Sequence, residues 1–369
     1  MTLEERRVIL LLAKIKLDDG ELAELRLLMQ THMDWSRIYG MLHTHRLLSI
    51  AYVTIDRHFS HEDIKNFAYP RLFSSLKNTY KIQYLKNTEH LKHTINVCNQ
   101  LKARGVRYVL LKGITLAIQH YEDIGIREFS DTDIMVHTSQ LQEAVNAIKE
   151  LGYLQGGFDE QKKDVVPASR KEIITSPLTS HEVVPLRKRV KHDFMSVHEV
   201  DVQFSMDLMS SNRTDELVEE ILNNAVVLNV EDNDIATLNP YDDLLYICIH
   251  YFKEATGEFD VKLYKDLGLY KICDLFQIVS KGEIDWNIFI RLVLERGLQK
   301  AVYFAFFYLN EIFGETVPSE MMKQISPGNL DYLNVVYEYN SKNVSIHWDT
   351  DVVDRVFDMN RAKEYFNLQ

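Results

Sequence analysis

The segment 109–153, VLLKGITLAIQHYEDIGIREFSDTDIMVHTSQLQEAVNAIKELGY, carries the pattern that decides the fold of this chain of 369 residues. Two short runs rich in branched or aromatic residues, 106–111 and 131–136, are typical of buried strands. The first run ends at the glycine turn Lys112-Gly113, and residues 115–121 are long enough for a short helix. Residues 122–130 lack an apolar period, so we expect a loop before the second strand.

One helix and one further strand follow on the C-terminal side. Apolar residues recur at three and four positions from 141 to 151, and Gly152 predicts the end of that helix. Residues 197–204, VHEVDVQF, alternate between apolar and polar, which predicts a half-buried strand. The outward face of that strand carries Glu199, Asp201 and Gln203.

The flanking parts of the chain have the apolar spacing of helices. We therefore predict an N-terminal helical domain over residues 1–104, a core of strands and helices over residues 105–236, and a C-terminal helical domain over residues 237–369. Within the core, residues 158–193 contain Pro167, Pro177 and Pro185. We expect this proline-rich segment to form loops and edge strands, as a hairpin or loop insertion.

Composition limits the classes of function. The chain has 42 basic and 54 acidic residues and a net charge of −12, which gives no support to general nucleic-acid binding. Cys98, Cys248 and Cys273 are far apart, so we expect buried thiols and neither a zinc site nor a disulfide framework. The first residues lack the pattern of a signal peptide, and no apolar run is long enough for a membrane span, so we expect a cytoplasmic protein without a membrane partner.

Asp131 and Asp133 carry the clearest chemical signal in the sequence. Because side chains alternate along a strand, both carboxylates lie on one face, close enough to share divalent cations. Ligands that are all oxygen suit Mg²⁺ or Mn²⁺, and a third carboxylate on a neighbouring strand would complete such a site. Asp-x-Asp also occurs at 232–234 and 349–351, and about one copy is expected by chance, but only Asp131 follows a strand that ends in a glycine turn.

The segment 109–153, with its Arg127-x-x-Ser130-Asp131-x-Asp133 block, resembles the core of nucleotidyltransferases of the DNA polymerase β-like fold. More narrowly, it resembles a bacterial branch of uncharacterised nucleotidyltransferases that carry Leu-Lys-Gly in place of the usual Gly-Ser. The similarity extends outward to four short stretches, which are Asp34-Trp35, LLYICIH at 244–250, KICDL at 271–275 and Ile-Asp-Trp at 284–286. The resemblance implies an α+β fold with a mixed sheet between N-terminal and C-terminal helical regions.

The same resemblance implies an enzyme that moves a nucleoside monophosphate from a nucleoside triphosphate (NTP) such as ATP to an acceptor, with release of pyrophosphate and with two Mg²⁺ or Mn²⁺ ions. It implies three carboxylates that are both catalytic and metal-binding, Asp131, Asp133 and Asp201. It further implies four residues that bind the NTP, Lys112, Gly113, Arg127 and Ser130.

The third carboxylate has an alternative, because Glu199 lies two residues before Asp201 on the same face of the predicted strand. Ile114 follows the glycine where the wider superfamily has Ser, and Gln203 stands where the branch more often has His. These two departures leave the roles of both positions open, although main-chain N–H groups of a glycine turn still suit phosphate.

Other polar residues also keep two interpretations. Lys112 either contacts phosphate or is solvated, and Arg127 binds phosphate oxygens or forms an ion pair with the aspartates. Ser130 is a possible turn residue, and His250 fits a core position better than a ligand. The basic residues of 187–191 either attract an anionic substrate or form a solvated surface.

The acceptor stays open among a small molecule, a peptide, a protein and an RNA end, with a small molecule or peptide favoured over nucleic acid. Two other classes of function compete with nucleotidyl transfer. One is a nucleotide-binding or interaction module that keeps the fold without catalysis. The other is a phosphohydrolase, because the same carboxylates with a metal can activate water. The preferred NTP and the oligomeric state are also open.

Overall fold

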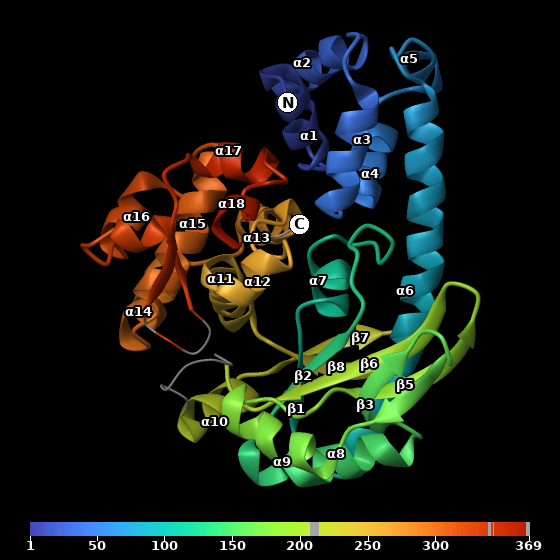
Figure 1. Ribbon diagram of the computed structural model, residues 1–369, viewed down its shortest axis with the longest axis vertical. Helices are drawn as coiled ribbons and strands as arrows, with labels where there is room; N and C mark the ends of the chain where they lie inside the picture. The colour runs from blue at the N-terminus through green and yellow to red at the C-terminus, as the bar shows by residue number, and fades with distance from the viewer. Residues whose placement is uncertain (207–213, 339–340, 342, 367–369) are drawn as a thin grey trace. The chain divides into compact units, whose positions relative to one another are not determined.

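The computed structural model describes residues 1–206, 214–338, 341 and 343–366 (Figure 1). The chain forms two compact units, one made of Met1–Lys81 with Ile247–Gln369 and the other of Ile82–Tyr246. The units change inside α6 (Arg71–Ala103) and α11 (Pro240–Thr256). The sequence instead placed domain boundaries at 104/105, just after α6, and at 236/237, near the end of the last strand of the sheet. The division into three domains stays a prediction.

The unit Ile82–Tyr246 is built on a mixed eight-stranded sheet with the order β4-β3-β5-β6-β2-β1-β8-β7. Its strands are β1 (Tyr108–Leu111), β2 (Thr132–Val136), β3 (Leu154–Asp159), β4 (Asp164–Pro167), β5 (Leu186–His192), β6 (Met195–Gln203), β7 (Val226–Val230) and β8 (Asn233–Thr237). The pairs β2–β6 and β1–β8 are parallel, and the other pairs are antiparallel. The expected α+β fold with a mixed sheet and flanking helices is confirmed.

One face of this sheet packs against α6 and α8 (Leu141–Glu150). The core there joins apolar residues of both helices to alternate residues of the central strands, among them Leu91, Ile95, Ala144, Ile148, Ile134, Val136, Val200 and Val202. The remaining helices of the unit are α7 (Ile114–Gln119), α9 (Arg170–Thr179) and α10 (Asp215–Asn223). Because strand side chains alternate, the residues between these core positions lie on the other face of the sheet.

The unit formed by the two ends of the chain is mainly helical. Its helices, besides parts of α6 and α11, are α1 (Leu3–Leu12), α2 (Asp19–Met29), α3 (Trp35–Thr44), α4 (Leu48–His58), α5 (His61–Lys65), α12 (Glu258–Lys262), α13 (Leu269–Ser280), α14 (Trp286–Glu295), α15 (Gln299–Phe313), α16 (Ser319–Gln324), α17 (Val352–Phe357) and α18 (Lys363–Phe366). Strands β9 (Val335–Tyr337) and β10 (Val344–His347) form a small antiparallel pair. Asp34 and Asp285, from two stretches of the resemblance, accept hydrogen bonds from main-chain N–H groups that begin α3 and α14.

The structure confirms the strands expected around 106–111, 131–136 and 197–204 and the helix expected at 141–151. Cys98, Cys248 and Cys273 are buried free thiols, as expected. Among the described residues, no helix combines the length and the apolar character that crossing a bilayer requires.

The prediction for residues 158–193 was partly wrong. β3 and β4 form the expected hairpin with β4 at the sheet edge, but β5 lies inside the sheet between β3 and β6. Residues Arg170–Thr179 form α9, although Pro177 lies within it. Ser169 and Glu172 form a capping box that starts this helix, and the proline near its end removes only one main-chain donor.

Candidate active site

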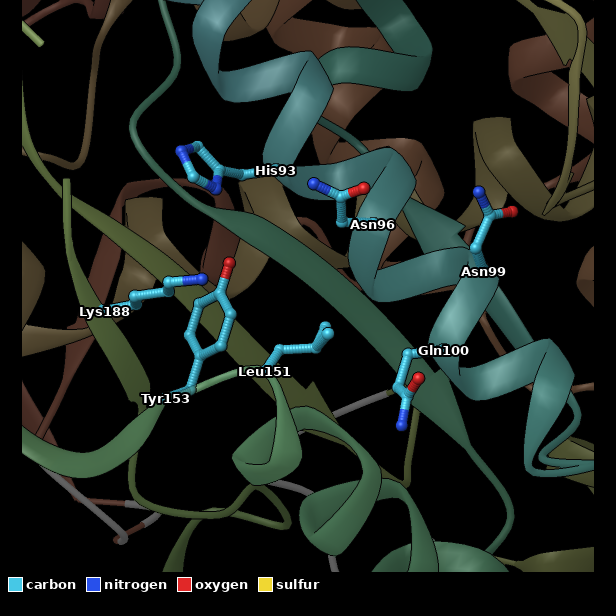
Figure 2. A pocket seen from close by; sticks show the side chains of 7 residues that line it. All are labelled: His93, Asn96, Asn99, Gln100, Leu151, Tyr153 and Lys188. Carbon is cyan, nitrogen blue, oxygen red and sulfur yellow. The ribbon is translucent and has the colours of Figure 1, made fainter. Parts of the chain in front are cut away.

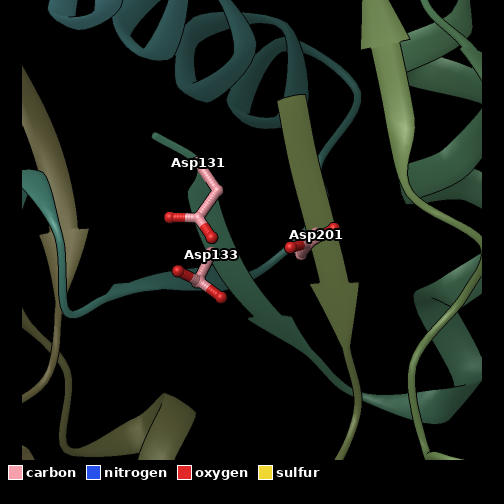
Figure 3. Close-up of side chains that lie close together, drawn as sticks. All are labelled: Asp131, Asp133 and Asp201. Atoms are coloured by element: carbon pink, nitrogen blue, oxygen red, sulfur yellow. The ribbon is translucent and has the colours of Figure 1, made fainter. Parts of the chain in front are cut away.

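Three carboxylates meet on the sheet face that points away from α6. Asp131 directly precedes β2, Asp133 lies on β2, and Asp201 lies opposite Asp133 in the parallel register of β2 and β6. Figure 3 shows the three side chains gathered over these two neighbouring strands. One carboxylate oxygen from each residue lies within 4.8 Å of the others, which is a suitable spacing for shared metal ligands. The structure therefore brings together the three residues that the sequence selected.

Burial makes this cluster electrostatically unfavourable without a cation. The side chain of Asp133 is 6% exposed, and burial raises its pKa to about 7, while the nearby Lys112 opposes the shift and Asp131 adds to it. Burial also raises the pKa of Asp201 well above its usual range, and the charges of Asp133 and Asp131 add to that shift. Asp201 Oδ1 is buried without a hydrogen-bond partner among the described residues. A cation would satisfy that oxygen and relieve the repulsion.

Lys112 reaches the cluster because of strand register. β1 pairs with β2 so that Leu111 lies opposite Asp133, and Lys112 is the next residue after Leu111. Its Nζ lies 3.1 Å from Asp133 Oδ2, and the side chain is 17% exposed. Lys112 is therefore an ion-pair partner of Asp133, and the alternative of a freely solvated lysine is wrong.

Gly113 forms the turn that follows Lys112. Its φ of 56° lies in the left-handed region that favours glycine, and Lys112 also has a positive φ of 25°. A Cβ added to Gly113 would lie 3.6 Å from the main-chain oxygen of Asp131, so the turn lies directly against the residue that starts the carboxylate cluster. Main-chain N–H groups in a turn of this kind suit an anion.

The loop before β2 carries the other two residues that the resemblance selected. Arg127 is buried, with 6% exposure, and its carbonyl oxygen accepts a hydrogen bond of 2.9 Å from Asn87 Nδ2. Ser130 is exposed and lies next to Asp131 in the chain. The structure leaves the roles of Arg127 and Ser130 in nucleotide binding as predictions.

Glu199 and Asp201 share a face of β6 but have different surroundings. Both oxygens of Glu199 accept hydrogen bonds of 2.7 Å from Arg187, from Nε and Nη2. Asp201 instead points into the carboxylate cluster. Geometry therefore favours Asp201 over Glu199 as the third carboxylate.

The structure adds residues that the sequence analysis missed or left without a role. Gln203 is buried, and its Nε2 donates a hydrogen bond of 3.0 Å to the hydroxyl of Tyr246. Tyr246 belongs to the 244–250 stretch of the resemblance, which is the signal that selects it. Glu182 pairs with Gln203 through an isolated bridge and adds to the raised pKa of Asp133. Nothing local in the sequence indicates Glu182, because it lies in the proline-rich segment.

The basic residues at 187–191 do not form a single patch. They lie on β5, so alternation sends neighbouring side chains to opposite faces. Arg187 pairs with Glu199, while Lys188 lies 5.5 Å from the ring of Tyr153 on the face that packs against α6. His250, whose role was open, is half-buried on α11 with Nδ1 3.3 Å from a carboxylate oxygen of Glu254.

Two pockets lie on opposite faces of the sheet. Figure 2 shows one of about 310 Å³ on the face toward α6, lined by His93, Asn96, Asn99, Gln100, Leu151, Tyr153 and Lys188. The other, of about 570 Å³, lies between the β3–β4 hairpin and α9 and includes Arg187 in its wall. Because Arg187 pairs with Glu199 on the carboxylate face, this second pocket opens on the same side of the sheet as the aspartates.

Comparison with known proteins gives this site a family. A family model described as "uncharacterised nucleotidyltransferase" matches residues 31–314, which is more than half of the chain. The chain belongs to this nucleotidyltransferase family. All seven site residues selected from the sequence lie within the matched range. Family membership supports nucleotidyl transfer as the class of reaction and a nucleotide as substrate, while the narrower branch with Leu-Lys-Gly stays a prediction.

The chain was also compared with curated proteins and with solved structures. No curated protein matches the chain. Among solved structures, it is similar to an antigenic nucleotidyltransferase-like protein from Paracoccidioides brasiliensis, with 12% sequence identity over 58% of this chain and 93% of that chain and a TM-score of 0.29.

Proposed function

We propose that this protein transfers a nucleoside monophosphate from an NTP to a hydroxyl or phosphate group of an acceptor and releases pyrophosphate. The observation that carries the proposal is the convergence of Asp131, Asp133 and Asp201 on one face of two adjacent strands. Membership of a nucleotidyltransferase family supports nucleotidyl transfer as the reaction that these carboxylates serve.

The carboxylates fit a pair of Mg²⁺ or Mn²⁺ ions. All three ligands are oxygens, the pKa values of Asp133 and Asp201 are raised where a cation would lower them, and one oxygen of Asp201 has no hydrogen-bond donor among the described residues. When bound, such ions supply charge neutralisation for the triphosphate, activation of the acceptor hydroxyl and stabilisation of the pyrophosphate leaving group. Asp131, Asp133 and Asp201 would hold them.

The residues around the carboxylates fit the triphosphate. When Asp133 ligates a metal ion, the Lys112 ammonium would leave Asp133 and contact a phosphate oxygen instead. The reason is that the ammonium and the metal ion repel each other at the same carboxylate. The N–H groups of the Lys112-Gly113 turn would bind phosphate oxygens. Arg127 and Ser130 would orient the same group from the loop before β2.

The pocket of about 570 Å³ between the β3–β4 hairpin and α9 offers a place for the acceptor on the carboxylate side of the sheet. Its volume suits a small molecule or a peptide side chain, and the net charge of −12 disfavours nucleic acid. We therefore propose a small molecule or peptide as acceptor.

The test incubates the full chain with each α-labelled NTP, with Mg²⁺ or Mn²⁺, and follows pyrophosphate release together with transfer of label to fractionated small molecules and peptides. We expect pyrophosphate and labelled product from the parent and neither from Asp133→Asn. Release of inorganic phosphate without label transfer would favour a phosphohydrolase. NTP binding without turnover under any of these conditions would favour a non-catalytic module.

A further inference from the structure

The helix α6 presents a buried polar face to the loop that leads into the candidate site. Gln83, Asn87, His90 and Thr94 follow one another at spacings of four, three and four residues and are each at most 8% exposed. Such spacing places them along one side of a helix. Burial of polar groups is costly unless each is hydrogen-bonded, so such a face calls for specific partners.

Asn87 binds the main chain of the loop. Its Nδ2 donates to the carbonyl oxygens of Arg127, at 2.9 Å, and of Ile124. Gln83 Nε2 donates to Asn87 Oδ1 at 2.7 Å, which fixes the orientation of the Asn87 amide. One side chain of α6 therefore holds the loop at two points, 124 and 127.

Thr94 binds the first residue of β2. Its Oγ1 lies 2.8 Å from Oγ1 of Thr132, the residue between Asp131 and Asp133. Thr132 Oγ1 lies 3.2 Å from His198 Nε2, and His198 Nδ1 lies 2.8 Å from the hydroxyl of Tyr153. The chain of hydrogen bonds thus connects α6, β2 and β6 behind the carboxylates.

His90 lies on α6 between Asn87 and Thr94 and also contacts the chain near Asp131. Its ring meets the ring of Phe129 edge to face, with centroids 5.1 Å apart, and lies 4.3 Å from the ring of His198. The polar face of α6 therefore touches the chain at 124, 127 and 129, before Asp131, and at 132, directly after it.

Regular strand pairing does not extend to Asp131. The ladder between β2 and β6 begins at Thr132, and the ladder between β1 and β2 reaches Asp133. The position of Asp131 consequently depends on what holds the residues on either side of it. Asn87 and Thr94 supply this support through the carbonyl of Arg127 and the hydroxyl of Thr132.

We propose that the buried polar face of α6, with Asn87 and Thr94 as its main contacts, is a positioning device that sets the geometry in which Asp131 and Asp133 bind a divalent cation. The metal part of this inference rests on the proposed function. Asn87 and Thr94 act through the loop and Thr132, and they are positioning residues.

The test compares Asn87→Leu with Leu91→Ala, a change one helical turn away in the apolar core of the same helix. Both should lower the thermal midpoint. We expect Asn87→Leu to weaken Mn²⁺ binding about 10- to 100-fold, because groups that orient metal ligands contribute on that scale. Leu91→Ala should keep Mn²⁺ affinity within about twofold of the parent, measured well below both midpoints. Hydrogen exchange at amides 124–131 should accelerate in Asn87→Leu and stay at the parental rate in Leu91→Ala.

A second pair keeps the test decisive if Asn87→Leu does not fold. Thr94→Val removes the hydroxyl, and Thr94→Ser keeps it, so only the first should weaken Mn²⁺ binding and accelerate exchange at 130–133. Thr88→Val is the matched control, because among the described residues the Thr88 hydroxyl donates to a carbonyl oxygen of its own helix, that of Tyr84. Equal Mn²⁺ affinities and equal exchange rates across these variants would overturn the proposal. If the parent binds no Mn²⁺, the metal of the proposed function fails, and the exchange rates alone decide the positioning role.

Discussion

Alternate residues of β2 and β6 form two faces of the sheet, and the buried polar groups on these faces differ. The face toward α6, with His198, is the histidine face, and the face with Asp133 and Asp201 is the carboxylate face. On the face toward α6, Thr132, His198 and Tyr153 are linked by hydrogen bonds between neutral groups. Burial lowers the pKa of His198 well below its usual range, which keeps the ring neutral. On the other face, Asp133 and Asp201 are two carboxyl groups at close range, and their ionised forms repel each other.

This contrast shows which face requires a ligand. Burial favours the neutral form of every group, so it raises the pKa of the aspartates and lowers that of the histidines. The histidine face reaches low energy with protein partners alone. The carboxylate face keeps repulsion that a cation can relieve, so we expect function on the carboxylate face and stability from the histidine face.

The largest expected effect comes from Asp133→Asn. We expect nucleotidyl transfer to fall by at least about 1,000-fold, because metal ligation contributes several kcal/mol to such reactions. The thermal midpoint in EDTA should stay at the parental value or rise, since the change removes a repelling buried carboxyl. Asp232→Asn, in the exposed β7–β8 turn, is the control and should change neither quantity. A large loss of stability in Asp133→Asn would contradict the contrast between the two faces.

The second prediction separates the two candidate third carboxylates on β6. Asp201→Asn should reduce transfer about as much as Asp133→Asn, because Asp201 points into the cluster. Glu199→Gln should keep transfer within about fivefold, since Glu199 is occupied by Arg187. Initial rates of pyrophosphate release at saturating NTP measure both variants. The reverse order of effects would assign the third position to Glu199.

The third prediction concerns the hydrogen bonds of His198 on the histidine face. His198→Leu leaves the hydroxyls of Thr132 and Tyr153 without their bond to the ring, so we expect a loss of about 2–4 kcal/mol in the free energy of unfolding. Tyr153→Phe removes one of these bonds and should cost about 1 kcal/mol. Urea unfolding followed by circular dichroism gives both values. Parental stability in His198→Leu would show that the hydrogen-bonded chain contributes nothing net.

The smallest expected effect is the pH dependence of metal-free stability. Asp133 has a folded-state pKa of about 7, raised above its unfolded value, so its contribution to stability is present below about pH 4 and is lost as pH rises through 7. His90 has a folded-state pKa of about 4, lowered by burial, so its contribution is present above about pH 6.5 and is lost as pH falls toward 4. The two groups oppose each other in the same window.

Variants separate these opposing slopes. In EDTA, between pH 4 and 7, the free energy of unfolding should rise more steeply with pH in Asp133→Asn than in the parent. In His90→Gln it should rise less steeply with pH than in the parent, or fall. Each difference in slope should reach about 1.4 kcal/mol per pH unit at most. Urea midpoints at half-unit steps of pH measure them. Parallel profiles for the parent and Asp133→Asn would contradict the raised pKa.

Much of the candidate site follows from local patterns in the sequence. The turn at Gly113 and the shared face of Asp131 and Asp133 depend only on neighbouring residues, and the structure shows both. Alternation also placed Asp201 and Glu199 on one face of their strand. The sequence could not choose between them, because the choice depends on Arg187, which lies on a different strand.

The helix α6 shows a second limit. Its apolar residues, such as Leu91 and Ile95, predict a helix and its core face. Asn87 and Thr94 also repeat with helical spacing, but a polar residue on a helix ordinarily lies in solvent, so the pattern alone does not reveal that these two are buried. Their burial depends on where the loop 122–130 passes.

The sequence by itself determined the helix at 141–151, the strands around 106–111, 131–136 and 197–204, the glycine turn and the paired aspartates, because these features follow from chain periods of two and about 3.6 residues and from single-residue conformational preferences. The tertiary structure decided that β2 lies between β6 and β1, that Asp201 lies opposite Asp133, and that Lys112 reaches them. It also decided that α6 supports the loop before Asp131. These outcomes depend on the order and register in which distant strands pair, and register follows from how the whole core buries its apolar face.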